Sequence, residues 1–224
     1  MQSKVVVLLF LLPAGRLKNW LLRRGGCDVD RTARIGHILV FRVSSFTIGP
    51  GVSIGSFNTI KNLREVNFGA SSSLGSWNWI SGSPEHYKTS EEAGRFFLGR
   101  HSALTSRHYV DATGGFSIGS YTTVAGHRSM FLTHGIDIVD SVQTCAPIKI
   151  GDYSIVSAGV KIVPGGSVPS RSVVAMGSVI LPGLEEEHCL YAGVPARAAK
   201  VLSPSSRYFH REKGVVYVRS KGVD

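Results

Sequence analysis

The sequence contains no long hydrophobic run. Its most apolar stretch, Val5–Leu12, has eight residues and is followed by Pro13. A helix that spans a membrane needs about 20 apolar residues, and no small-residue cleavage site typical of a signal peptide follows the stretch. We therefore expect neither a spanning helix nor a signal peptide, and we expect a cytoplasmic protein.

Cysteine is scarce as well. The 224 residues include three cysteines, Cys27, Cys145 and Cys189, which are odd in number and lie far apart. They form neither a Cys-x-x-Cys pair nor a spacing typical of zinc ligands. This pattern favours a reducing compartment, and it predicts no metal site.

Acidic side chains are in the minority. The chain has 15 Asp and Glu against 25 Lys and Arg, which gives a formal net charge of +10. Half of this charge comes from residues 195–224, whose charged residues are Arg197, Lys200, Arg207, Arg211, Lys213, Arg219, Lys221, Glu212 and Asp224. Such a tail can meet an acidic membrane surface or a phosphorylated ligand, or it can be solvated and partly disordered. No aromatic-interleaved basic patch is present, so a nucleic-acid partner is not expected.

An aliphatic residue returns every six positions between residues 150 and 184. The residues at this spacing are Ile150, Val156, Ile162, Val168, Val174 and Ile180. A period of six fits neither an α-helix nor a plain strand, and it is typical of a short-repeat solenoid in which each unit forms one flat side of a coil. The first residue and the small fifth residue of each unit should point inward. The sequence therefore predicts an all-β fold, a parallel β-helix.

The same repeat extends towards the N-terminus with interruptions. Its inward residues there are Ile48, Ile54, Ile60, Val66, Leu74, Ile80, Leu98, Leu104, Val110, Ile118, Val124 and Met130. A polar, charged stretch at about residues 82–97 interrupts it, and we expect this stretch to leave the coil as a loop, where substrate contacts are often found. A second break lies between Met130 and Ile148 and contains His134.

A short amphipathic helix is expected near the N-terminus, where Leu17, Trp20 and Leu21 stand among basic residues. Two roles remain open for it. It can cap the open first turn of the solenoid, or it can contact the inner face of a membrane. The chain then divides into an N-terminal apolar segment with a capping helix, a β-helix domain, and a closing segment with a basic tail, at residues 1–30, 31–185 and 186–224.

Polar residues that could carry chemistry gather in three stretches of the repeat. His108 lies 19 residues before His127, and Asp111 lies 19 residues before Met130. Since one turn of the prism takes about three six-residue units, these residues should occupy one side of neighbouring turns. His134 follows directly, in the second break. A polar cluster at one edge of a simple solenoid is a candidate site.

Motifs in the C-terminal half make the chain resemble the hexapeptide-repeat acyltransferases, which form left-handed parallel β-helices. The Pro-Ile-Lys-Ile-Gly-Asp run at 147–152 is similar to the family's Pro-Ile-x-Ile-Gly run, and Tyr-Ala-Gly-Val-Pro-Ala-Arg at 191–197 is similar to its closing motif. Thr133 and His134 stand where the family has its catalytic Ser/Thr-His pair. The chain looks most like the branch of colanic-acid and maltose O-acetyltransferases of surface-polysaccharide synthesis, over about residues 13–202.

The resemblance implies an O-acetyltransferase that transfers an acetyl group from acetyl-coenzyme A to a sugar hydroxyl in glycan biosynthesis, directly and with His134 as general base. It also implies a left-handed coil, against the usual right-handed crossover, and a homotrimer with acetyl-coenzyme A and the carbohydrate acceptor between subunits. Ala158 and Ala175 match positions that line the coenzyme A arm. Arg197 matches a basic residue near its phosphate end, and Lys200 is a further candidate there.

The residue that orients His134 stays open, because Asp111, Asp137 and Asp140 are all candidates. His108 and Tyr109 either lie on the acceptor side or only order the coil.

Other functions stay open too. The alternatives are an N-acetyltransferase that acts on an amino sugar, a non-catalytic scaffold, and a metal enzyme like the γ-class carbonic anhydrases. The last would use His108, His127 and His134 as ligands, but their spacing does not fit that class.

Overall fold

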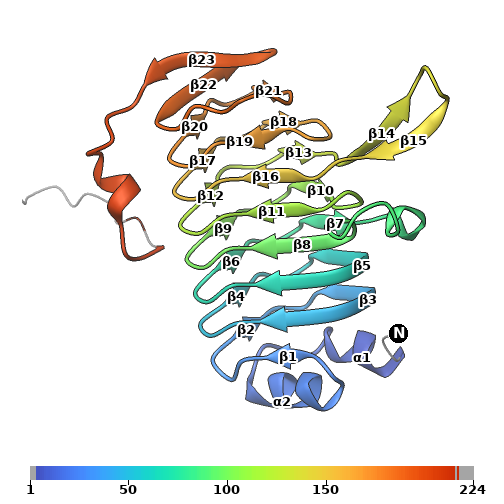
Figure 1. Ribbon diagram of the computed structural model, residues 1–224. Coiled ribbons are helices and arrows are strands. Elements are labelled where there is room, and N and C mark those ends of the chain that lie inside the picture. Colours follow the sequence, from blue (N-terminus) through green and yellow to red (C-terminus); the bar gives the residue numbers. More distant parts are fainter. Residues whose placement is uncertain (1–3, 215, 217–224) are drawn as a thin grey trace, which may run out of the picture.

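The computed structural model describes residues 4–214 and 216. Within them the chain winds into a solenoid whose coils stack along one axis, as Figure 1 shows. Helices α1 (Lys4–Leu9) and α2 (Arg16–Arg24) lie at one end, and an antiparallel pair, β22 (Cys189–Gly193) and β23 (Ala196–Val201), closes the other. The prediction of a left-handed parallel β-helix is confirmed.

Three flat sides enclose the core. One side is a nine-stranded sheet, which contains β22, β23 and the strands β2 (Arg34–Ile35), β4 (Ser53–Ile54), β6 (Ser73–Leu74), β9 (Ala103–Leu104), β12 (Thr123–Val124), β17 (Ile155–Val156) and β20 (Val173–Val174). The other two sides belong to a 12-stranded sheet of β1 (Asp28–Val29), β3 (Leu39–Ile48), β5 (Thr59–Phe68), β7 (Trp79–Ser81), β8 (Arg95–Leu98), β10 (Tyr109–Asp111), β11 (Phe116–Ile118), β13 (Met130–Phe131), β16 (Ile148–Ile150), β18 (Lys161–Ile162), β19 (Ser167–Val168) and β21 (Val179–Ile180). This sheet covers two sides because β5 turns a corner, pairing first with β7 and then with β8.

The six-residue repeat marks the core as predicted. Its inward residues are at most 2% exposed, and they are Ile150, Val156, Ile162, Val168, Val174 and Ile180. The fifth positions are buried too, namely Ser154, Val160, Gly166, Ser172 and Ser178. Each buried Val or Ile side chain stabilises the fold by roughly 1.5–3 kcal/mol relative to an exposed one.

The register before β13 differs from the prediction. Met130, expected to point inward, is 40% exposed, whereas Phe131 is fully buried and lies beside Val110 of the preceding turn. The corner after Val124 holds one residue more than a six-residue unit, and such an insertion moves the following side chains to the opposite face. The neighbouring turns are therefore offset by 21 residues here, and not by 19.

A ladder of buried polar side chains fills one corner of the prism. The backbone N–H of Asn78 donates to Asn58 Oδ1 at 2.8 Å, that of His108 to Asn78 Oδ1 at 2.9 Å, and that of Ser129 to His108 Nδ1 at 3.3 Å. Each side chain thus accepts a hydrogen bond from the next turn, whose buried N–H would otherwise lack a partner. These residues hold consecutive coils together.

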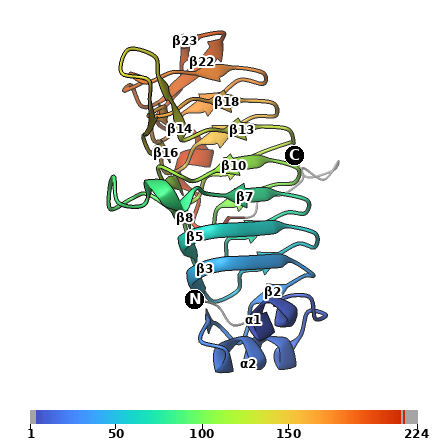
Figure 2. The same ribbon diagram turned by 90° about the vertical axis from the view of Figure 1, so that its right-hand side faces the viewer.

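Both interruptions of the repeat leave the coil at the same corner (Figures 1 and 2). Residues 82–94 form a loop that contains the 3₁₀ helix η1 (Pro84–His86), and β14 (His134–Asp137) pairs with β15 (Val142–Cys145) in an antiparallel hairpin. The loop ends earlier than the predicted residue 97, because Arg95 already begins β8 and Phe96 is buried in the core.

Residues 202–214 of the basic tail include segments packed against the solenoid, which differs from the solvated tail that the composition allowed. It contains the 3₁₀ helix η2 (Arg207–His210) and lies against another corner of the solenoid (Figure 1). The Tyr208 hydroxyl is 3.3 Å from the Ser154 carbonyl oxygen, Phe209 is buried, and Arg211 donates to the carbonyl oxygen of Tyr121. The basic residues Arg219 and Lys221, and Asp224, lie outside the described residues.

The N-terminal helices cover the first coil, which is one of the two roles open from the sequence. Phe10 and Leu22 are buried in the core. Lys18 is buried as well, and its Nζ lies among four carbonyl oxygens, at 2.7, 2.9, 3.1 and 2.7 Å from those of Phe10, Leu12, Ile35 and Gly36. Burial lowers the pKa of Lys18 to about 8. Among the described residues, no helix has the length and apolar character needed to cross a membrane.

Candidate active site

The corner from which the loop and the hairpin protrude also brings Asp111 and His134 together. Asp111 ends β10, and β10 pairs in parallel with β13, so Asp111 lies beside the residues that follow β13. The chain leaves the coil after Thr133, and His134 is the first residue of β14. Asp111 Oδ2 and His134 Nδ1 are 2.7 Å apart.

The Asp111 carboxylate accepts hydrogen bonds from three residues. Oδ1 accepts from the backbone and hydroxyl of Thr113, and Oδ2 accepts from the backbone and side chain of both Thr133 and His134. Burial alone raises the pKa of Asp111, but the hydrogen bonds from Thr113, His134 and Thr133 outweigh it and lower the pKa below its ordinary value. Asp111 is therefore a fixed, charged acceptor.

This arrangement determines the tautomer of His134. Because Asp111 is a carboxylate, His134 Nδ1 carries the proton of their hydrogen bond, and Nε2 carries the lone pair. The His134 side chain is 41% exposed, whereas that of Asp111 is 5% exposed. The pair thus presents a basic nitrogen to the surface and keeps its carboxylate buried, an arrangement that suits general-base catalysis.

The extruded loop supplies a second histidine to the site. The rings of His86 and His134 have their centroids 6.2 Å apart, and His86 Nε2 lies 2.9 Å from Gln143 Oε1 on the hairpin. A further contact of 3.2 Å joins Thr89 Oγ1 to Cys145 Sγ. Sequence reasoning did not single out His86, and its only signal was its position in the predicted loop.

The other acidic candidates do not contact His134. Asp137 Oδ1 accepts from the backbone N–H groups of Val139 and Asp140 at 2.8 and 3.3 Å, so its carboxylate stabilises the hairpin turn. Asp140 is exposed in that turn. Of the three aspartates, the structure brings Asp111 to the imidazole.

His108 is buried in the polar ladder. It is 2% exposed; its Nδ1 accepts from the Ser129 backbone, and its Nε2 lies 3.0 Å from Thr105 Oγ1. Burial, with a smaller contribution from nearby His127, lowers the pKa of His108 to about 4. His108 thus takes the coil-ordering role, one of the two that the sequence left open, whereas Tyr109 is exposed on the outer face of β10.

The residues matched to coenzyme A positions lie away from His134 in the same chain. Ala158 and Ala175 are half-buried at the corner that precedes β18 and β21, at the opposite end of that side from His134. The Ala175 N–H donates to the Tyr191 carbonyl oxygen at 2.8 Å, and among the described residues the Ala158 N–H has no hydrogen-bond acceptor. Arg197 and Lys200 are exposed on β23.

The described residues contain no group of three or more His, Cys, Asp or Glu side chains that could hold a metal ion. Both ring nitrogens of His108 already have hydrogen-bond partners, so the ligand set of His108, His127 and His134 is not available.

Comparisons with known proteins agree with this fold. No protein-family model matches the chain. The chain is 30% identical over 73 residues to "Putative acetyltransferase YJL218W" of Saccharomyces cerevisiae, an alignment that covers 31% of this chain and 37% of that protein. It therefore spans well under half the length of this curated relative.

Solved structures align over most of the chain. A mutant of AntD, an N-acyltransferase from Bacillus cereus in complex with dTDP and coenzyme A, is 15% identical, with a TM-score of 0.52 over 85% of this chain and 93% of its own. The polysialic acid O-acetyltransferase OatWY is 16% identical, with a TM-score of 0.48 over 87% of both chains. The similarity to AntD shows a shared β-helix fold.

Proposed function

We propose that this protein is an O-acetyltransferase of the hexapeptide-repeat type, which transfers an acetyl group from acetyl-coenzyme A to a sugar hydroxyl. The hydrogen bond between His134 and Asp111 is the observation that carries the proposal. A scaffold would not need a half-exposed imidazole held by a buried carboxylate. The motifs around Pro147 and Pro195 and the fold shared with AntD support the same class.

The reaction needs a base, because a sugar hydroxyl is a weak nucleophile near neutral pH. His134 Nε2 takes the hydroxyl proton while the sugar oxygen attacks the thioester carbonyl carbon. The C–S bond breaks, and the proton passes from His134 to the departing sulfur, which yields an acetyl ester and free coenzyme A. Asp111 keeps the imidazole in place and stabilises its protonated form. The transfer is direct and requires no Ser or Cys nucleophile.

The placement of the coenzyme residues favours a site shared between subunits, and we propose a homotrimer. The side of the prism between the Ala158 corner and His134 has a column of exposed apolar residues at equivalent positions of its strands. They are Leu39, Trp79, Tyr109 and Met130, with Thr59 between the first two. Burying this column against a second copy would bring the Ala158 corner of one subunit towards His134 of another.

Calorimetric titration with coenzyme A tests the class first. We expect micromolar binding at one site per subunit, followed by thiol release when acetyl-coenzyme A and a suitable sugar are supplied together. A folded protein that binds no acyl-coenzyme A would favour the scaffold alternative. Treatment of the product with mild base distinguishes transfer to a hydroxyl from transfer to an amine. It hydrolyses an acetyl ester, whereas the amide formed on an amino sugar is stable.

A further inference from the structure

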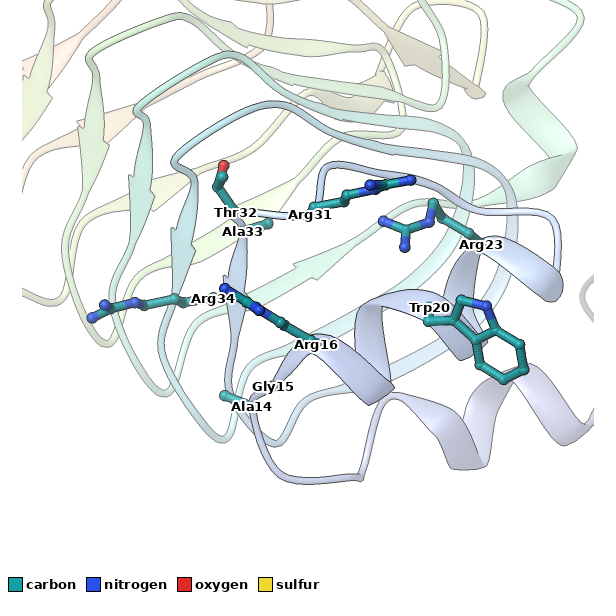
Figure 3. A pocket seen from close by; sticks show the side chains of 9 residues that line it. All are labelled: Ala14, Gly15, Arg16, Trp20, Arg23, Arg31, Thr32, Ala33 and Arg34. Atoms are coloured by element: carbon teal, nitrogen blue, oxygen red, sulfur yellow. The ribbon is translucent and has the colours of Figure 1, made fainter.

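A hollow of about 940 Å³ lies between α2 and the first coil, far from His134 along the solenoid. Arginine supplies four of its nine lining residues, which are Arg16, Arg23, Arg31 and Arg34. In Figure 3 the side chains of Arg23 and Arg31 point toward one another, Arg16 lies on the near side, and Trp20 stands at the edge. The hollow therefore presents positive charge beside an aromatic ring.

This positive charge is only partly compensated. None of the lining residues is acidic, and no ion pair within the described part of the chain includes one of these four arginines. Asp30 is near Arg23 and Arg31, but its Oδ1 is bound to the backbone and hydroxyl of Thr32 at 2.7 and 2.6 Å. Those bonds first, and the two arginines to a smaller extent, lower the pKa of Asp30. Asp30 is therefore a carboxylate, and Asp28 lies beside Arg23 and Arg31 as well. The four arginines outnumber these two carboxylates, so a net positive charge remains for an anionic group.

Large apolar side chains are exposed on the same helices. On α2, Leu17 is 68% exposed and Trp20 is 46% exposed, whereas Lys18 and Leu22 face the coil. Leu17, Trp20 and Arg24 follow helical spacing and share the outer face. On α1 and just beyond it, Leu8 and Leu11 are exposed too. Basic residues next to exposed Leu and Trp are typical of helices that lie in a membrane interface.

We propose that this end of the solenoid docks on a membrane surface that contains anionic phospholipids. The guanidinium groups of Arg16, Arg23 and Arg31 bind lipid phosphate, and Leu17 and Trp20 enter the boundary between headgroups and acyl chains. A soluble phosphate ligand would use the arginines alone, so the exposed apolar residues favour a lipid as the occupant. The inference goes beyond the proposed activity and does not depend on it.

The test measures binding of the full chain to vesicles by co-sedimentation. We expect binding to vesicles of phosphatidylcholine and phosphatidylglycerol that weakens with added salt, and little binding to phosphatidylcholine alone. The double variant Arg16→Glu/Arg31→Glu should bind about tenfold more weakly or worse, and Leu17→Ser/Trp20→Ser should lose most binding too. The matched control, Arg107→Glu/Arg128→Glu, changes the same charge at a distant exposed corner and should bind like the wild type.

A second measurement does not depend on how those variants fold. With Trp77 and Trp79 replaced by Phe, the emission of Trp20 should shift to shorter wavelength when anionic vesicles are added. Absence of that shift would overturn the proposal, as would an equal loss of binding in the control. Unchanged binding of Leu17→Ser/Trp20→Ser, together with competition by inorganic phosphate, would show that the arginines recognise a phosphate group without membrane insertion, which would overturn the proposed docking. Coenzyme A binding, measured separately, reports on the proposed activity.

Discussion

His134 Nδ1 lies 2.7 Å from Asp111 Oδ2, although the two residues are 23 positions apart in the sequence. The bond joins the end of a coil strand to the first residue of a hairpin that leaves the coil. The carboxylate is buried and held by threonine donors, so it is positioned before any substrate binds. In the proposed reaction the pair acts as a preorganised base, and its removal should then affect turnover more than binding.

Replacing His134 by Gln removes the base and keeps a polar side chain of similar size. We expect turnover to fall by about a hundredfold or more, with little change in the affinity for coenzyme A measured by calorimetry. His37→Gln is the matched control, since His37 is exposed between β2 and β3, far along the solenoid from His134. Nearly normal turnover in His134→Gln would refute the assignment of the base.

Asp111→Asn and Asp137→Asn distinguish the two aspartates. Asp111→Asn should lower turnover by about a hundredfold or more and reduce the free energy of unfolding by about 1–3 kcal/mol, because the amide cannot accept all the donors around it. Asp137→Asn should leave turnover nearly unchanged.

A double variant separates positioning from a general loss of structure. If Asp111 acts through His134, combining Asp111→Asn with His134→Gln should lower turnover no further than His134→Gln alone. If the losses of turnover from the two single variants multiplied in the double variant, Asp111 would not act through His134.

His108 should make stability depend on pH. The pKa of His108 in the folded state, about 4, lies below the ordinary 6.5. The stabilising contribution of neutral His108 to the free energy of unfolding is therefore complete above pH 6.5 and is lost as the pH falls towards 4. Over that range the unfolded chain binds a proton that the folded chain does not, which costs about 3 kcal/mol. His108→Asn, which repeats the ladder residue Asn78, should remove most of this dependence in urea unfolding at pH 7 and 4.5. If the wild type and His108→Asn showed the same dependence of unfolding free energy on pH, His108 would not be its source.

The register at β13 can be tested with two neighbouring residues. Phe131→Ala should lower the free energy of unfolding by about 3–5 kcal/mol, because it leaves a cavity in the core. Met130→Ala removes an exposed side chain and should cost much less in the isolated subunit. A larger loss for Met130→Ala than for Phe131→Ala in denaturant unfolding would mean that the six-residue count, and not the observed register, describes this turn.

The proposed trimer depends on the apolar column of the exposed side. Trp79→Glu/Tyr109→Glu should place charges in the subunit interface and shift the protein to monomers in sedimentation, with turnover lost and the coil still folded. Ser53→Glu/Ser73→Glu adds as many glutamates on the nine-stranded side, which carries none of these apolar residues, and should not exclude assembly. A trimer that persists in the first variant would place the interface elsewhere.

Local pattern predicted most of the fold. A coil of flat sides requires an inward residue at every unit, and the spacing of Ile150 to Ile180 records that requirement directly in the sequence. The pattern did not predict the position of Met130, because one additional corner residue shifts the register without disturbing composition. It also did not predict how far the basic tail packs, since contacts such as that between Tyr208 and Ser154 join distant segments.

The sequence by itself determined the β-helix, the loop and the candidacy of His134. Each of them depends on a local pattern: the six-residue repeat, its polar interruption, and the Thr133–His134 pair in the second break. Only the tertiary structure decided that Asp111 orients His134, that His86 joins them, and that His108 is buried in a ladder. Asp137 and Asp140 are nearer to His134 along the chain. Parallel strand pairing and the exit of the hairpin bring Asp111 to the imidazole, and those depend on how coils stack in space.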